Sequence, residues 1–177
     1  MAFEWPGYDP PGYGDTQSLL EADGIDLQTL RGARICNVCS AWDVQAERWC
    51  ASSPVVFELE GLQLEIGFKN ERLIRLTINE IQMSVTNAGD CFTGPGARRL
   101  PYEWRTDRFE LAPYVGRFIL GADLLEKIDG GSGIIGICFR IDGGKLELVN
   151  VASAGGVEIG INPPDSATFG TKRVIAI

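Results

Sequence analysis

The chain contains an internal sequence repeat, and this feature restricts the possible folds most strongly. Residues 55–66, VVFELEGLQLEI, correspond to residues 137–148, ICFRIDGGKLEL, 82 positions further along. A shorter match, GARI at 32–35 against GRFI at 116–119, precedes it at nearly the same separation. The identical pairs of the longer match are Phe57 and Phe139, Gly61 and Gly143, Leu64 and Leu146, and Glu65 and Glu147. Such a repeat predicts two copies of one structural unit that bury a shared core.

Apolar and polar residues alternate within the repeat. In the first copy Val55, Phe57 and Leu59 alternate with positions that include Glu58 and Glu60, and the same period continues to residue 78. Period-two alternation is typical of antiparallel strands with one wet face. Residues 60–61 and 69–71 supply turns, so residues 55–85 are predicted to form a meander.

Weaker signals flank the meander. Asp15 and Asp26 each precede a short helical sequence and can cap it. Residues 34–38 are predicted as a strand, and residues 44–50 as a short helix or a loop, because Trp42 and Trp49 are two helical turns apart. In the second copy, strands are predicted at 114–120, 133–141, 145–151 and 156–161.

The predicted fold is therefore mainly β, with two sequence-related antiparallel meanders that form a sandwich or one continuous curved sheet. One or two short helices are expected near the N-terminus. The chain is predicted to be a single domain over residues 1–177, a length typical of one domain. Its parts are repeat A at about 31–86, an ordered connecting segment at about 87–113, repeat B at about 114–161, and a C-terminal strand within 162–177.

The net charge of −8 is unevenly distributed. Residues 1–30 carry six acidic residues and no Lys or Arg, whereas the remaining residues carry 18 acids and 16 bases. An acidic surface repels phosphate backbones, so nucleic acid is not an expected partner. A basic protein is the natural complement, and solubility alone is the other interpretation.

Five cysteines without a regular pattern favour reduced thiols in a cytosol. No apolar run reaches the roughly 20 residues of a membrane helix, and the first basic residue, Arg31, comes too late for a secretory signal. We therefore expect a cytoplasmic protein that does not insert into a membrane.

Three motifs could carry chemistry. Cys36 and Cys39 form a CxxC pair, but the chain has no histidine to complete a zinc site, so buried apolar thiols are the favoured interpretation. Residues 131–136, GSGIIG, match a dinucleotide fingerprint, yet they precede a predicted strand instead of a helix, which favours a glycine-rich turn. No metal or cofactor is expected.

The third motif is a row of carboxylates on the predicted outward positions of the sheets, namely Glu58, Glu60, Glu65, Asp142 and Glu147. Such a row can be a solvated sheet face, a pair for acid–base catalysis, or a docking surface for Lys and Arg. The absence of histidine, the commonest general base, lowers the expectation of an enzyme.

In its size, acidity, duplicated β-rich repeat and lack of a catalytic set, the chain resembles the immunity proteins of bacterial toxin systems, such as contact-dependent inhibition and other polymorphic toxins. The resemblance implies a protein that is not an enzyme and that neutralises a cognate, basic toxin by binding it. The alternative is a small-ligand-binding or carboxylate-dependent enzyme domain in a β barrel or sandwich. For the immunity interpretation, the expected partner-binding residues are Asp15, Glu21, Asp23, Glu58, Glu60 and Glu65.

Overall fold

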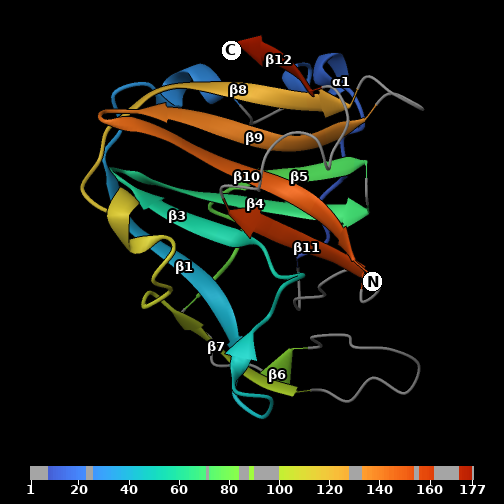
Figure 1. Cartoon of the computed structure of the whole chain (residues 1–177), viewed down its shortest axis with the longest axis vertical. Helices are drawn as coiled ribbons and strands as arrows, with labels where there is room; N and C mark the ends of the chain where they lie inside the picture. The colour runs from blue at the N-terminus through green and yellow to red at the C-terminus, as the bar shows by residue number, and fades with distance from the viewer. Residues whose placement is uncertain are drawn as a thin grey trace.

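The computed structural model describes residues 8–22, 26–70, 72–83, 88–89, 100–127, 133–153, 156–161 and 172–176. The fold is mainly β, as the alternation predicts, and consists of two antiparallel sheets (Figure 1). The helical parts are short: α1 (Thr16–Leu20) and the 3-10 turns η1 (Leu27–Leu30) and η2 (Ala112–Tyr114). Asp15 caps α1 and Asp26 caps η1, which confirms both predicted caps.

The two sheets have matching strand orders. The first sheet runs β5-β4-β3-β1-β7-β6, with β2 also paired to β1, and the second runs β11-β10-β9-β8-β12. The strands of the first sheet are β1 (Ile35–Asp43), β2 (Arg48–Trp49), β3 (Val55–Leu59), β4 (Leu62–Asn70), β5 (Leu73–Ile78), β6 (Ala88–Gly89) and β7 (Leu100–Arg105). Those of the second sheet are β8 (Ile119–Lys127), β9 (Ile134–Ile141), β10 (Gly144–Ser153), β11 (Gly156–Ile161) and β12 (Lys172–Ala176).

The two halves of the long sequence match form equivalent hairpins. In the β3–β4 hairpin Phe57 pairs with Leu64, and in the β9–β10 hairpin Phe139 pairs with Leu146. All five residue pairs of β3–β4 have counterparts in β9–β10 at the separation of 82. The turn glycines Gly61 and Gly143 have φ angles of 89° and 92°, a left-handed conformation that favours glycine.

The shorter match forms the connection between the two sheets. The backbone N–H of Gly32 donates to the oxygen of Ile119 at 2.7 Å, and the N–H of Gly116 donates to the oxygen of Ile35 at 2.7 Å. These bonds exchange equivalent partners, so the two copies are related by a local two-fold axis that passes between residues 34 and 118.

The core lies between the two sheets and is built from the inward positions of both copies. Phe57 and Phe139 are both fully buried, as the repeat predicts, and their ring centroids are 5.5 Å apart with an interplanar angle of 64°. Edge contacts of this kind are favourable beyond the burial of area. The two equivalent phenylalanines therefore join the two sheets at the centre of the molecule.

Residues 44–50 do not form a helix. They form the turn and second strand of a hairpin in which Trp42 and Trp49 are directly opposite, with ring centroids 5.0 Å apart. The carboxylate of Asp43 accepts the backbone N–H groups of Gln45 and Ala46 at 3.0 and 2.9 Å, which closes the turn. A spacing of seven residues fits two helical turns, but it also fits a cross-strand pair around a tight turn.

Two further features differ in detail from the predicted elements. The connecting segment contains a regular strand, β7, which pairs with β1 and which sequence analysis does not predict. The strand predicted at 114–120 begins only at Ile119 and continues to Lys127, because residues 112–114 form η2. The C-terminal strand is present as β12.

Candidate functional site

Two of the predicted partner-binding acids, Asp15 and Glu21, flank helix α1, and a third acid, Asp26, caps η1, which packs against β8 (Figure 1). Asp15 accepts the N–H and the hydroxyl of Ser18 at 2.8 and 2.7 Å, and these bonds lower the pKa of its carboxyl. Glu21 accepts Nε2 of Gln17 at 2.8 Å. Asp26 accepts the N–H of Gln28 at 2.9 Å. All three carboxylates are solvent-exposed. Asp23 lies outside the described residues.

These carboxylates differ from the ion-paired acids in having no cationic partner among the described residues, a property that they share with the exposed Glu47, Glu80 and Asp107. Among the described residues, Asp15, Glu21 and Asp26 form no ion pair with Lys or Arg. Elsewhere the ion pairs are Arg34–Glu60, Arg75–Asp9, Arg105–Glu103, Arg108–Glu110, Arg117–Asp142, Arg140–Asp123 and Lys145–Glu147. We call Asp15, Glu21 and Asp26 the acidic surface. Its negative charge is left uncompensated within the described part of the chain.

The sheet carboxylates are less accessible than sequence analysis predicts. Glu60 is exposed at the β3–β4 turn and pairs with Arg34 at 3.2 Å. Glu58 is half-buried. Glu65 points to the outer face, as expected, but it is fully buried, so the expectation that it is available to a partner is wrong.

Glu65 is buried because non-local segments cover it. Its Oε1 accepts Nε2 of Gln63 at 2.6 Å and the backbone N–H groups of Glu80 and Ile81 at 3.0 and 3.2 Å. Its Oε2 is buried without a hydrogen-bond partner among the described residues. The carboxylate therefore holds residues 80–81 against the sheet, which is a structural role.

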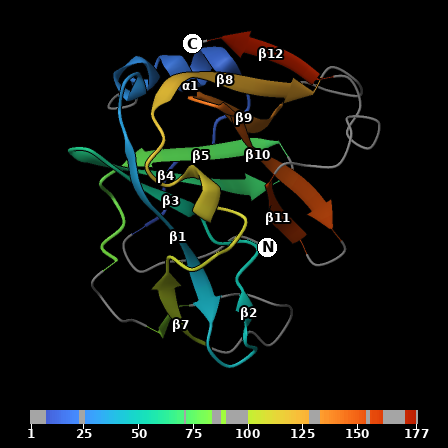
Figure 2. The ribbon, with the colours of Figure 1, turned by 60° about the vertical axis from the view of Figure 1, so that its left-hand side comes forward.

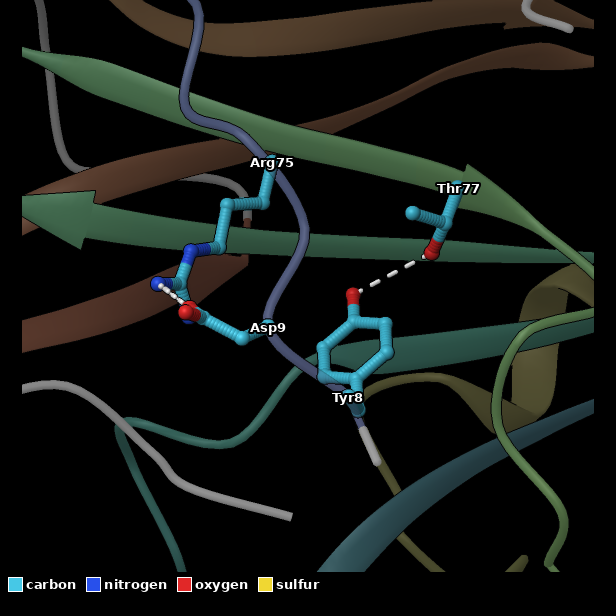
Figure 3. Close-up of polar contacts among 4 residues, drawn as sticks. All are labelled: Tyr8, Asp9, Arg75 and Thr77. Carbon is cyan, nitrogen blue, oxygen red and sulfur yellow. Dashed lines mark hydrogen bonds and ion pairs between the residues drawn. The ribbon is translucent and has the colours of Figure 1, made fainter. Parts of the chain in front are cut away.

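The outer face of the first sheet is also covered by residues 8–13, which we call the N-terminal strap (Figure 3). The hydroxyl of Thr77 donates to the Tyr8 hydroxyl oxygen at 3.2 Å, and Nη2 of Arg75 lies 3.0 Å from Oδ1 of Asp9. Burial raises the pKa of Tyr8 to about 12. Tyr13 exchanges two backbone hydrogen bonds with Ile74 at 2.8 and 3.0 Å, which attaches the strap to the edge strand β5.

Sequence analysis did not identify the ion pair between the strap and Arg75. Arg75 is only 5% exposed, and its guanidinium donates to the carboxylate of Asp9, which lies 66 residues away in the chain. No local pattern identifies such a pair. The aromatic residues of the strap were the only available signal, since large rings in an extended segment favour docking.

The two cysteines of the CxxC pair are not joined by a disulfide. Cys36 is exposed and Cys39 is buried, both lie in β1, and both are free thiols. Burial raises the pKa of Cys39 to about 12 and that of Cys138 to about 11, which makes thiolate formation unfavourable. The described residues contain no group of three or more Cys, Asp or Glu side chains arranged to hold a metal ion.

Cys50 corrects the expectation that all thiols are reduced, because it is disulfide-bonded. With Cys36, Cys39 and Cys138 free, the fifth cysteine, Cys91, lies outside the described residues. The glycine-rich motif at 131–136 leads into strand β9, so it lacks the helix that a dinucleotide site requires.

An exposed apolar segment also escaped sequence analysis. Four of the six large apolar side chains that are exposed among the described residues fall between positions 109 and 120. They are Phe109 at 78%, Val115 at 42%, Phe118 at 44% and Leu120 at 51% exposure. Isolated exposed apolar residues are common, whereas several in one short segment make that segment a candidate interaction surface.

No helix in the described part of the chain is both long and apolar enough to span a membrane. Comparison of the chain with protein-family models, with curated proteins and with solved structures gives no match. Functional inference therefore depends on the chemistry of these surfaces.

Proposed function

We propose that this chain is an immunity-type protein, which neutralises a cognate basic toxin domain by binding it and which catalyses no reaction. One observation supports this best: the three exposed carboxylates of the acidic surface fall within residues 15–26, and none of them has a cationic partner among the described residues. Opposite potentials accelerate encounter and disfavour wrong partners. Acids whose charge is already balanced by Arg34 or Arg75 contribute less to such a field.

The partner-binding residues in this proposal are Asp15 and Glu21, with Asp23 beside them in the sequence and Asp26 added by the structure. Glu58 and Glu60 remain candidates on the sheet, whereas Glu65 is excluded by its burial. The alternative, a ligand-binding or carboxylate-dependent enzyme domain, receives less support. The space between the sheets is filled by apolar side chains, and Glu65 already accepts three hydrogen bonds.

The proposal includes a cytoplasmic location, because an immunity protein acts where its toxin acts. The disulfide at Cys50 argues against a cytoplasmic location, because disulfides are rare in a reducing cytosol. Mass spectrometry of protein that is unfolded in denaturant and alkylated before reduction tests the location. Five alkylated cysteines support a cytosolic protein, and an oxidised Cys50 supports an oxidising compartment.

The function is tested with the product of the adjacent gene in the source genome as the probe. We expect its expression alone to arrest growth of a host cell and co-expression of this chain to restore growth. For the purified pair, association should slow as ionic strength rises. Absence of both rescue and binding would refute the proposal.

Charge-neutral variants test the acidic surface. Asp15→Asn, Glu21→Gln and Asp26→Asn keep hydrogen-bond acceptors at the caps while removing charge. We expect each to slow association several-fold at low salt. Glu47→Gln is the matched control, because it removes the same charge from the exposed β1–β2 turn, at the opposite end of the molecule from α1 (Figures 1 and 2). Equal rates for all four variants and the wild type would mean that the acidity serves solubility alone.

A further inference from the structure

Residues 27–36 of the first copy and 111–120 of the second have the same backbone structure. Each contains a 3-10 turn, then a glycine with φ of 86° (Gly32) or 87° (Gly116), then the start of a strand. Their hydrogen bonds also correspond. The N–H of Ile35 donates to the oxygen of Arg117 at 2.8 Å, and the N–H of Ile119 donates to the oxygen of Ala33 at 2.9 Å.

The correspondence extends to the first irregularity of each strand. The β1–β3 register shifts between Ile35 and Asn37, and the β8–β9 register shifts between Ile119 and Gly121. A residue of each strand therefore bulges at the same place, Cys36 in one copy and Leu120 in the other. Side chains at matching positions of the two segments can be compared directly.

Three exposed positions differ sharply between the copies. The first copy has Arg31, Arg34 and Cys36, whereas the second has Val115, Phe118 and Leu120. All six side chains are exposed. The first copy shows that this backbone does not require apolar residues at these positions. The three apolar side chains of the second copy are therefore not explained by folding.

We infer that Val115, Phe118 and Leu120, which we call the apolar face, form the central contact for the basic protein partner. This inference rests on the proposed function and adds the surface that supplies most of the binding energy. Interface centres are apolar and rich in aromatic residues, while their rims are charged. A partner that fits has apolar side chains opposite Phe118 and basic residues on the side that meets the acidic surface.

The charges next to the apolar face nearly balance. Arg34 is paired with Glu60 and Arg117 with Asp142. The exposed Arg31 lies at the opposite end of η1 from the exposed Asp26. The turn η1 packs against β8, which begins beside the apolar face, and η1 starts at the exposed Asp26 of the acidic surface (Figure 1). The apolar face and the acidic surface are thus joined through η1 and β8.

A matched pair of valines tests the apolar face. Val115 is 42% exposed and Val44, in the β1–β2 turn at the far end of the molecule, is 44% exposed. Val115→Arg installs the residue that the first copy has at this position, so the fold should accept it. We expect Val115→Arg to weaken binding of the adjacent gene product at least tenfold, whereas Val44→Arg, with the same change in charge, should bind like the wild type.

A second variant removes apolar area without adding charge. The double variant Phe118→Ser, Leu120→Ser should weaken binding at least tenfold with the same far-ultraviolet circular dichroism spectrum as the wild type. Unchanged affinity of both face variants, with a binding wild type, would overturn this inference and leave the proposed function standing. A wild type that does not bind would refute the proposed function itself, and the inference with it. Analytical ultracentrifugation of the chain alone tests whether the apolar face instead binds a second copy of the chain. A wild-type dimer that becomes monomeric in these variants would overturn the inference that the face binds the basic partner.

Discussion

The two copies of the repeat preserve the inside of the molecule and differ on the outside. Inside, Phe57 and Phe139 occupy equivalent, fully buried positions, and the pairing register around them is identical. Outside, the fully buried Glu65 corresponds to Glu147, which is paired with the exposed Lys145. Inward residues must fit a shared core, whereas outward residues are free to acquire separate roles.

The outer faces show the same divergence on a larger scale. The N-terminal strap covers part of the first sheet and supplies Tyr8 to an apolar cluster with Cys39, Ala41, Cys50, Val56, Ile81 and Tyr102. The second sheet has a smaller outer cluster of Leu125, Ile135, Cys138 and Val149. Function is therefore best sought where the copies differ.

The largest expected effect concerns the shared core. Phe57→Ala and Phe139→Ala should each lower the free energy of unfolding by about 3–5 kcal/mol, through lost transfer energy and a residual cavity. Urea denaturation of both variants measures this. Because the two rings are in contact, the double variant should cost less than the sum of the single changes. A large difference between the two single variants would break the equivalence of the copies.

Local patterns in the sequence were sufficient to predict the hairpins, their turn glycines and both helix caps. Phe57 and Gly61 carry their signal within a few neighbouring residues, through alternation and the need for positive φ. Strand β7 was missed because Pro101 and several charges interrupt its pattern, and its partner β1 is about 60 residues away. The burial of Glu65 was missed because its cover comes from residues 80–81, 15 or more positions along the chain. The repeat predicts which residues face inward. It gives no information about segments that have no counterpart in the other copy.

The next largest effect is expected for the N-terminal strap, through the pH dependence of the stability that Tyr8 contributes. The raised pKa of Tyr8, about 12, lies above its unfolded value of about 10, so the neutral phenol is favoured in the folded state. The corresponding stability is fully present below pH 10 and is lost as the pH rises toward 12. A shift of two units corresponds to about 2–3 kcal/mol.

The comparison of wild type with Tyr8→Phe isolates this contribution, because other tyrosines and lysines titrate equally in both. We expect the stability of the wild type relative to Tyr8→Phe to fall between pH 10 and 12, as measured by urea denaturation. Parallel pH profiles for the two proteins would show that Tyr8 ionises as freely as an exposed tyrosine and that the strap is not docked.

The equivalent glutamates give a smaller effect. Glu65→Ala leaves two backbone N–H groups without their acceptor and should cost about 1–3 kcal/mol. Glu147→Ala removes an ion pair to a lysine that is 65% exposed, so its cost should stay within about 1 kcal/mol. Glu65→Gln retains an acceptor oxygen and should recover most of the loss. Equal costs for the two alanine variants, measured by thermal and urea unfolding, would contradict the assigned difference in burial.

The smallest effect concerns the CxxC pair, at positions where the copies no longer match. Cys36 occupies the position of Leu120 and is exposed, whereas Cys39 is buried with a pKa raised to about 12. We therefore expect an alkylating reagent at pH 8 to modify Cys36 rapidly in the folded protein, and Cys39 and Cys138 only after unfolding. Site-resolved mass spectrometry measures the three rates. Cys36→Ser should change the free energy of unfolding by no more than about 0.5 kcal/mol, because surface substitutions rarely do more. Slow modification of Cys36 together with stoichiometric zinc that is lost in Cys36→Ser would instead make the pair a metal site, and β1 would then carry chemistry that β8 lacks.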